Sequence, residues 1–269
     1  MLKNIANYSF NLSIKKSILD DILYRVRKSR IVNDFGNKEW KYGTEETYLK
    51  DLIEYWSNNY DWKKQEKEIN KFSHYKIEID NIPIHFIYEK GSSENSKPLI
   101  LTHGWPWTFW DYKKIIEPLS HPEKYGGNAS DSFDVIIPSL PGYGFSTPLK
   151  ETGINFWKTS DIWVKLMTNI LGYEKFFAHG GDWGAAVTLQ LGHKYSEIVP
   201  AVHTHMAVPI DFVTNPHPDI SFYSDSEKKW HEKNMNFVTE GNGYFQIQAS
   251  RPQTLAYGLN DSPIGLLAW

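Results

Sequence analysis

The chain has 269 residues, no cysteine and a formal net charge of −3, so its length allows one or two domains with a large core. The lack of cysteine excludes disulfides, thiolate metal sites and a thiol nucleophile, and the charge favours neither nucleic acid nor an anionic membrane as a partner. The first residues hold no apolar stretch of signal-peptide length, and no later window has the length of a membrane span. We therefore expect a soluble, cytoplasmic protein.

The N-terminal part is predicted to be helical up to about residue 70. Apolar side chains recur with a period of 3.6 in residues 17–30 and again from about Glu45, where Thr44 is the expected N-cap. A short charged helix follows at 61–70. The period then changes to two on either side of Asp80–Asn81, which predicts a β-hairpin over residues 75–88.

Residues 98–208 show a strand–helix alternation. Short apolar strands are predicted at 98–104, 133–144, 175–181 and 201–208, and helices at 110–119, 156–171 and 185–195. Such alternation indicates a parallel sheet covered by helices on both faces, with the chemistry gathered at the carboxyl ends of the strands. Residues 210–269 show no further strand and are predicted to be mostly helical or loop-like.

The segment HGGDWGAA, residues 179–186, places Asp182 between a predicted strand and a predicted helix. This is the small-x-nucleophile-x-small pattern of the nucleophile elbow, with Asp in place of Ser. Gly180, Gly181 and Gly184 would avoid the collisions that Cβ atoms meet in so sharp a turn. A carboxylate at a helix start is ionised at pH 7 and attacks carbon without a base, which gives an ester. The alternative is an ordinary N-capping aspartate, and this motif alone leaves both open.

The segment HGWP, residues 103–106, follows the strand one unit earlier. In the hydrolase fold one oxyanion-hole N–H comes from the residue after the nucleophile, here Trp183, and another from the loop after such an earlier strand. His103 and Gly104 would turn the chain so that the N–H of Trp105, just before Pro106, points into the pocket. The two motifs together favour a hydrolase active site over a capped helix and a tight turn.

At this point the chain resembles a known family, the epoxide hydrolases of the microsomal type, from about Tyr8 to Trp269. Besides HGWP and HGGDWG, the resemblance rests on WKYG, IDNIPIHFIYEKG, DVIIPSLPGYGFS, GYFQIQASRPQT and LNDSPIGLLAW. It implies an α/β-hydrolase fold, a mostly parallel sheet with a helical N-terminal segment and a helical cap, with the last strands missing. We expect an N-terminal segment at 1–92, the first part of the hydrolase core at 93–209 and an incomplete cap at 210–269.

The resemblance also implies a reaction, the opening of a small apolar epoxide to a vicinal diol with no cofactor and no metal. Asp182 would attack an oxirane carbon, and Tyr244 matches the first of two cap tyrosines that hydrogen-bond the ring oxygen. The N–H groups of Trp105 and Trp183 would stabilise the oxyanion when water attacks the ester. Trp107 stands where the family more usually has a small residue. Aromatic rings interpreted mainly as packing are those of Tyr143, Phe145 and Tyr257.

The rest of the family's catalytic set has no match here. Its acid, its histidine and its second tyrosine follow the cap, and the fold's order is nucleophile, acid, histidine. His179 is interpreted as a core or supporting residue, and none of the remaining candidates is assigned: His193, His203, His205, His217 and His231. We therefore expect the isolated chain to be limited to the alkylation half-reaction, with an unpaired sheet edge and a possible second polypeptide that supplies the rest.

Two other interpretations stay open. Haloalkane dehalogenases also pair an elbow aspartate with a following tryptophan and also form an ester, although the N-terminal helical segment and GYFQIQASRPQT favour the epoxide reaction. A non-catalytic fragment that binds apolar ligands or a partner subunit is the other interpretation, and the unmatched histidine supports it.

Overall fold

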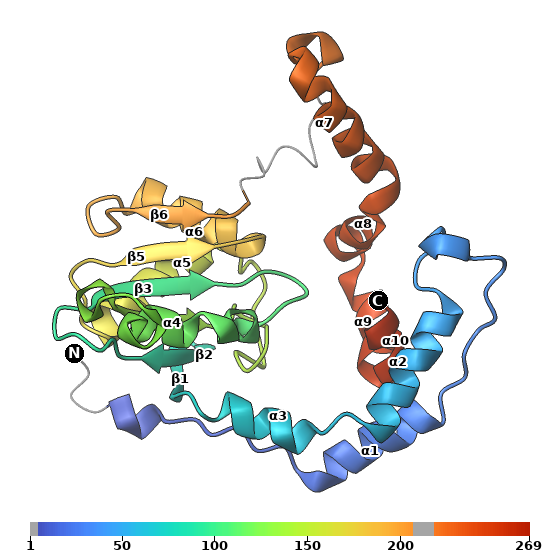
Figure 1. The fold of residues 1–269 in the computed structure, drawn as a ribbon, viewed down its shortest axis with the longest axis horizontal. Helices are drawn as coiled ribbons and strands as arrows, with labels where there is room; N and C mark the ends of the chain where they lie inside the picture. Colours follow the sequence, from blue (N-terminus) through green and yellow to red (C-terminus); the bar gives the residue numbers. More distant parts are fainter. Residues whose placement is uncertain (1–4, 207–217) are drawn as a thin grey trace. The chain divides into compact units, whose positions relative to one another are not determined.

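The computed structural model describes residues 5–206 and 218–269 (Figure 1). By their contacts these residues form two compact units, one of residues 5–12 and 66–206 and the other of residues 13–65 and 218–269. The three segments expected from the sequence remain a prediction, since contact grouping and family boundaries divide a chain by different criteria. Among the helices in the described ranges, none combines the length and apolar character needed to cross a bilayer.

The first unit is built on a six-stranded sheet with the order β1-β2-β4-β3-β5-β6 (Figure 1). β1 and β2 form the predicted hairpin and β2 pairs antiparallel with β4, whereas β4, β3, β5 and β6 run parallel. The strands are β1 (His74–Ile79), β2 (Ile82–Glu89), β3 (Lys97–Thr102), β4 (Phe133–Pro138), β5 (Phe177–Gly180) and β6 (Val202–Thr204). Asp80 and Asn81 have φ values of 52° and 64°, the left-handed pair that a two-residue hairpin turn requires.

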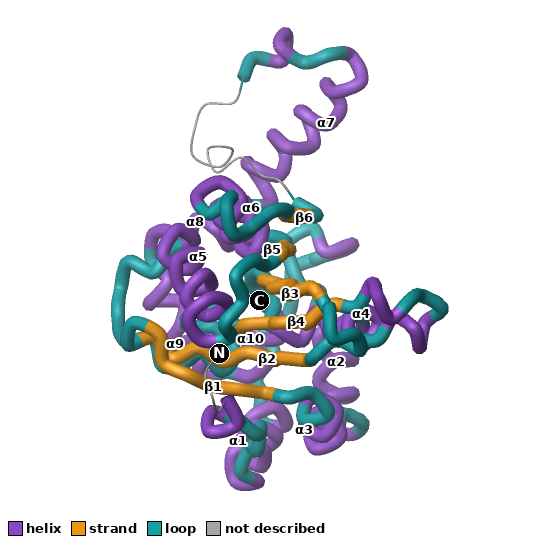
Figure 2. The backbone as a smooth tube through the Cα atoms, turned by 90° about the vertical axis from the view of Figure 1, so that its left-hand side faces the viewer, coloured by secondary structure: helices purple, strands orange, loops and turns teal. Residues whose placement is uncertain are grey.

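Helices cover both faces of this sheet, as Figure 2 shows with α4 on one side and α5 and α6 on the other. They are α4 (Ile116–Ser120), α5 (Phe156–Lys165) and α6 (Trp183–Lys194). The single helix predicted at 110–119 is instead a 3-10 helix, Phe109–Lys114, followed by the short α4. Pro118 explains the break, because its ring cannot donate to the carbonyl of Lys114 and clashes with it. The helix predicted to 171 continues from α5 as a π turn, Leu166–Ile170.

The core lies between the sheet and the pair α5 and α6. Fully buried side chains from the middle strands meet those of the two helices, among them Ile84, Phe86, Ile100, Ile136, Trp163, Leu166 and Leu191. Trp163 also donates its indole N–H to the hydroxyl of Thr102, 3.1 Å away, at the carboxyl end of β3. The best-packed part of the unit therefore holds the strands that lead into the two motifs.

The second unit joins both ends of the chain. Its helices are α1 (Lys16–Arg27), α2 (Glu46–Asn58), α7 (Asp225–Asn236), α8 (Gly243–Ser250), α9 (Pro252–Asp261) and α10 (Pro263–Ala268), while α3 (Trp62–Ile69) spans the boundary between the units. Arg25 donates to the carbonyl oxygen of Asp261 at 3.0 Å. Thr44 was predicted to cap α2, but the N-cap residue is Glu45. The hydroxyl of Thr44 instead donates to the carbonyl of Ala268 at 2.7 Å.

Candidate active site

Asp182 stands at the junction between β5 and α6, at the carboxyl end of a central strand. Its φ is 53° and its ψ is −128°, a combination that non-glycine residues rarely adopt and that costs about 1–3 kcal/mol. The side chain is partly buried. Such strain persists only where neighbouring groups fix the backbone, so the contacts of the surrounding residues define the site.

The glycines on either side of Asp182 make room for backbone. A Cβ on Gly180 would overlap the carbonyl oxygen of Gly184, and a Cβ on Gly184 would overlap the carbonyl oxygen of Thr102 in β3. Neither obstacle is a flexible side chain. The close packing of strand, elbow and helix therefore requires both glycines, for the reason the sequence pattern suggested.

The carboxylate of Asp182 faces the HGWP loop. The backbone N–H of Trp105 donates a hydrogen bond to Oδ1 of Asp182 at 2.9 Å, and a Cβ on Gly104 would overlap the Asp182 side chain. Asp182 precedes α6 in the N-cap position, yet its side chain makes no capping hydrogen bond. The carboxylate of Asp182 therefore does not cap α6 and instead contacts the HGWP loop.

Trp183 is the first residue of α6, and its side chain is 42 % exposed. Its N–H is one of the donors that the start of a helix leaves without an intrahelical partner. Together, the N–H groups of Trp105 and Trp183 are the two donors that the hydrolase pattern assigns to an oxyanion hole.

His103 supports the loop that carries Trp105. Its Nε2 accepts the N–H of Leu140 at 3.1 Å, so the proton lies on Nδ1, which donates to the carbonyl of Gly104 at 2.9 Å. Burial lowers the pKa of His103 to about 4, although the hydrogen bond to Gly104 and the charge of Asp182 both act to raise it. Both ring nitrogens are therefore used to hold backbone, and this neutral histidine does not serve as a base.

A cavity of about 340 Å³ opens beside the elbow. It is lined by His103, Gly104, Trp107, Asp111, Tyr112, Gly181 and His205. Trp107, which is 49 % exposed, and Asp111 also line a neighbouring cavity of about 460 Å³. Trp107 thus borders both spaces. Burial raises the pKa of Asp111.

Tyr143 packs beside the site, in agreement with the packing predicted for it. Its ring packs edge-on against His103, with 5.6 Å between centroids, and burial, with the nearby charge of Asp182, raises its pKa to about 12. Tyr143 is in the loop after β4, at the same sheet edge as the elbow. Phe145 does pack, against Phe10 and Phe109, whereas Tyr257 is 70 % exposed, so that packing prediction is wrong.

The histidines are spread over the described chain, and none of their rings hydrogen-bonds Asp182 there. His179 and His203 pair with each other, with 2.8 Å between their Nδ1 atoms, and burial lowers the pKa of His179. His205 lies against Gly181. His193 is near the end of α6 and His231 packs against Tyr223 in the second unit, while His217 lies outside the described residues. In the same described ranges, no group of three or more potential ligands is placed to hold a metal ion.

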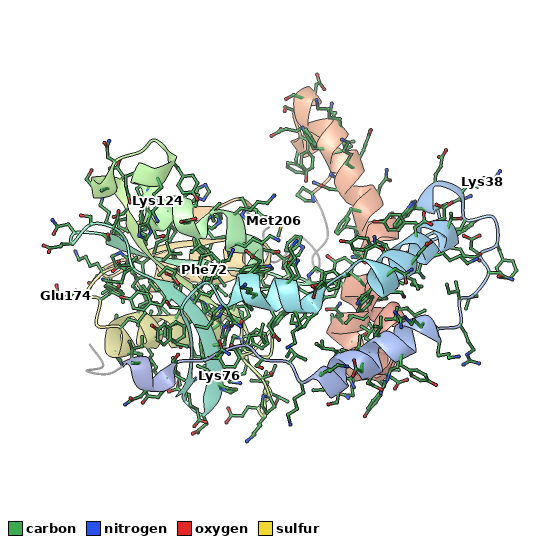
Figure 3. The ribbon with its side chains drawn as sticks, turned by 60° about the horizontal axis from the view of Figure 1, so that its bottom comes forward. Lys38, Phe72, Lys76, Lys124, Glu174 and Met206 are labelled. Carbon is green, nitrogen blue, oxygen red and sulfur yellow. The ribbon has the colours of Figure 1, made fainter. Side chains whose placement is uncertain are left out.

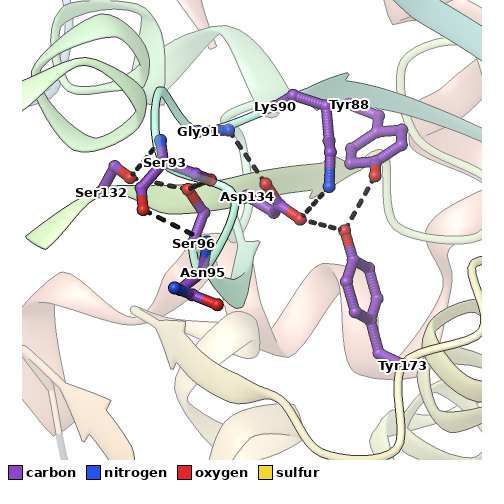
Figure 4. A network of polar contacts seen from close by, with 9 residues as sticks. All are labelled: Tyr88, Lys90, Gly91, Ser93, Asn95, Ser96, Ser132, Asp134 and Tyr173. Carbon is purple, nitrogen blue, oxygen red and sulfur yellow. Dashed lines mark hydrogen bonds and ion pairs between the residues drawn. The ribbon is translucent and has the colours of Figure 1, made fainter. Parts of the chain in front are cut away.

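A buried carboxylate, that of Asp134, lies near the start of β4 in a separate polar network (Figure 4). It pairs in register with Pro98 near the start of β3, far along the strands from the elbow. Its Oδ2 accepts from Lys90 at 2.6 Å and from Tyr173 at 2.5 Å, and its Oδ1 accepts the N–H of Gly91 at 2.9 Å. These contacts tie loops to the amino ends of the strands, so Asp134 is a structural residue and not a partner of Asp182.

Tyr244 belongs to the second unit. It is in the first turn of α8 and is 36 % exposed. Its role towards an epoxide is a proposal.

Comparisons with known proteins agree with this geometry. Residues 7–112 match the family model "Epoxide hydrolase N terminus" and residues 97–246 match "alpha/beta hydrolase fold". Epoxide hydrolase 1 of Sus scrofa is 32 % identical over 274 residues, and juvenile hormone epoxide hydrolase 1 of Ctenocephalides felis is 30 % identical over 282. These alignments cover 97 % and 99 % of this chain but only 60 % and 59 % of the relatives. The chain therefore spans about three fifths of their length.

The solved structure of Aspergillus niger epoxide hydrolase matches with a TM-score of 0.83 and 28 % identity, over 97 % of this chain and 68 % of that one. Juvenile hormone epoxide hydrolase from Bombyx mori matches with a TM-score of 0.77 and 26 % identity, over 97 % and 61 %. The predicted fold class is confirmed. The chain belongs to the alpha/beta hydrolase fold family and, within it, to the epoxide hydrolases that carry the epoxide hydrolase N terminus.

Proposed function

We propose that this chain carries the nucleophilic half of a hydrolase that opens small apolar epoxides to vicinal diols through an alkyl ester on Asp182. The observation that carries the proposal is the 2.9 Å hydrogen bond from the Trp105 N–H to Oδ1 of a strained elbow carboxylate. The choice of an epoxide over another electrophile is supported by the names of the relatives reported above, which are epoxide hydrolases.

In the first step, Oδ2 of Asp182 attacks an oxirane carbon while Oδ1 stays bonded to the Trp105 N–H. The bond between that carbon and the ring oxygen breaks, and the ring oxygen leaves as an alkoxide. The hydroxyl of Tyr244 donates to this oxygen and delivers its proton, since a phenol is a neutral donor at pH 7. The product is a 2-hydroxyalkyl ester of Asp182.

In the second step, a base takes a proton from water and the resulting hydroxide attacks Cγ of the ester. The negative charge then develops on Oδ1, the atom that already accepts from Trp105, and the N–H of Trp183 is the second donor. The tetrahedral adduct collapses, and the departing alkoxide takes the proton held by the base to give the diol. The carboxylic acid that remains on Asp182 gives up its proton, which replaces the one that Tyr244 lost in the first step, so the carboxylate and the neutral phenol are both restored.

The base of the second step is not assigned to any histidine of the described chain. His103 has both nitrogens bonded to backbone, and His179 is paired with His203. We therefore propose that the 269-residue chain on its own stops at the ester. A second polypeptide as source of the base has no support, because the relatives extend beyond the matched region within one polypeptide.

The experiment is intact mass spectrometry of the chain after incubation with styrene oxide, with chromatography of the diol in the same samples. The proposal expects one added epoxide per chain and little diol, and no adduct in Asp182→Asn. Rapid diol formation that Asp182→Asn abolishes would refute the half-reaction limit but retain Asp182. An adduct that survives Asp182→Asn would refute the nucleophile itself.

A further inference from the structure

The ring of His205 lies directly on the elbow glycine that precedes the nucleophile. The three heavy atoms nearest to where a Cβ on Gly181 would stand are Cε1, Nε2 and Nδ1 of His205. Gly181 has no positive φ, so its backbone would accept an alanine. Gly180 and Gly184 differ, because backbone carbonyls fill the space next to them. At Gly181 the obstacle is a single exposed side chain, the ring of His205.

The strand register brings His205 to this place. In the parallel pair of β5 and β6, Gly180 lies opposite Thr204, so the next residue of each strand, Gly181 and His205, emerge side by side at the carboxyl edge. The ring of His205 is also 5.5 Å from that of His179, at an interplanar angle of 33°, and it lines the cavity beside the elbow. Met206 follows as the last described residue before the gap (Figure 3).

We propose that His205 is a positioning residue for Asp182. Its imidazole rests against Gly181 and backs the peptide that leads into Asp182, whose φ of 53° is held only while neighbouring groups leave no alternative. The carboxylate then keeps Oδ1 at the Trp105 N–H, within the roughly 0.5 Å that a productive site allows. The catalytic consequence rests on the proposed function, whereas the contact itself does not.

The contact is tested by a double-mutant cycle in thermal unfolding of the 269-residue chain. Gly181→Ala is expected to lower Tm in the native background and to leave Tm unchanged in the His205→Gly background, because the ring that the new Cβ would meet is gone. Gly184→Ala is the matched control and is expected to lower Tm equally in both backgrounds, since its obstacle is the carbonyl of Thr102. Additive effects of Gly181→Ala and His205→Gly would overturn the contact.

Positioning is tested by the rate of Asp182 alkylation, followed by mass spectrometry over a range of styrene oxide concentrations. His205→Ala is expected to lower the maximal rate constant at least about tenfold, as small misplacements do, with little change in the half-saturating concentration. His205→Phe keeps a ring against Gly181 and is expected to restore most of the rate. If His205→Phe is as slow as His205→Ala, or if neither is slow, the positioning role is overturned.

The two arms separate this inference from the proposed function. If the native chain forms no adduct, the proposed function fails, while the unfolding cycle still confirms or refutes the contact of His205 with Gly181.

Discussion

The backbone N–H of Trp105 donates to Oδ1 of Asp182 at 2.9 Å, although 77 residues separate the two in the chain. The donor comes from the loop after β3 and the acceptor from the elbow after β5, two strands that lie side by side in the sheet. In the proposed reaction this oxygen is the one that becomes the oxyanion. The site therefore has its donor aligned before charge develops, which is how backbone amides stabilise such transition states.

Asp182→Asn is expected to abolish alkylation while leaving the fold intact. The amide oxygen of Asn still accepts from Trp105, and Asn tolerates positive φ better than most residues, but a neutral amide is no nucleophile. Adduct formation by mass spectrometry and thermal unfolding measure the two effects. Asp111→Asn, in the wall of the cavity beside the elbow, is the control and should still be alkylated. An Asp182→Asn chain that is alkylated at the native rate would contradict this role.

Gly104→Ala is expected to slow alkylation about 100-fold, because the new Cβ would overlap the Asp182 side chain and displace the carboxylate. The matched control is Gly258→Ala in α9, where no atom lies within 4 Å of the added Cβ. Its alkylation rate should equal that of the native chain. Equal alkylation rates in the two variants would show that the close approach of Gly104 to Asp182 does not affect alkylation.

Tyr244→Phe tests the donor to the epoxide oxygen. Loss of a positioned hydroxyl is expected to lower the alkylation rate about 100-fold, and thermal unfolding checks that the variant is folded. Tyr257→Phe, at a position 70 % exposed in the next helix, is the control and should leave the rate unchanged. If the two variants react alike, Tyr244 is not the donor.

The stability of the chain is expected to fall as the pH drops below about 6.5. Burial lowers the pKa of His85 to about 2 and that of His103 to about 4 from the ordinary 6.5. His85 Nε2 bonds to Nδ1 of His74 at 2.9 Å in a fully buried pair. The folded state holds these rings neutral, while the unfolded chain takes up protons below pH 6.5. The stability that these neutral rings contribute is therefore fully present above that pH. It is lost progressively as the pH falls towards the folded-state pKa values, about 4 for His103 and about 2 for His85.

Urea unfolding at several pH values between 7.5 and 5 measures this effect. The slope should approach about 1.4 kcal/mol per pH unit for each such histidine, and His103→Asn should remove one histidine's share of it. A free energy of unfolding that stays constant over this range would show that these rings are not held neutral.

Local patterns were sufficient to predict the parts of the fold whose cause is local. The hairpin follows from period-two apolar residues around Asp80 and Asn81, and the elbow follows from glycines flanking Asp182 after an apolar strand. The sequence also contained the cause of one error, since Pro118 divides the helix predicted at 110–119.

Features that depend on contacts between distant segments were not predictable from such patterns. Thr44 has the residue type and the position of an N-cap, which is why that role was predicted. Its actual partner, the carbonyl of Ala268, is 224 residues away and leaves no trace in the local pattern. Likewise, the group beside Gly181 is the ring of His205 on the next strand, although the elbow pattern had suggested only strand or helix backbone.

The central claim, that Asp182 is the nucleophile, is tested most directly by locating the bound epoxide in the sequence. Trypsin releases residues 176–194 as one peptide that contains Asp182 together with His179 and His193, so fragmentation must assign the site. We predict a styrene oxide adduct on Asp182 that hydroxylamine removes, as it does an ester, and that Asp182→Asn lacks. An adduct confined to His179 or His193, or one that resists hydroxylamine, would contradict the account.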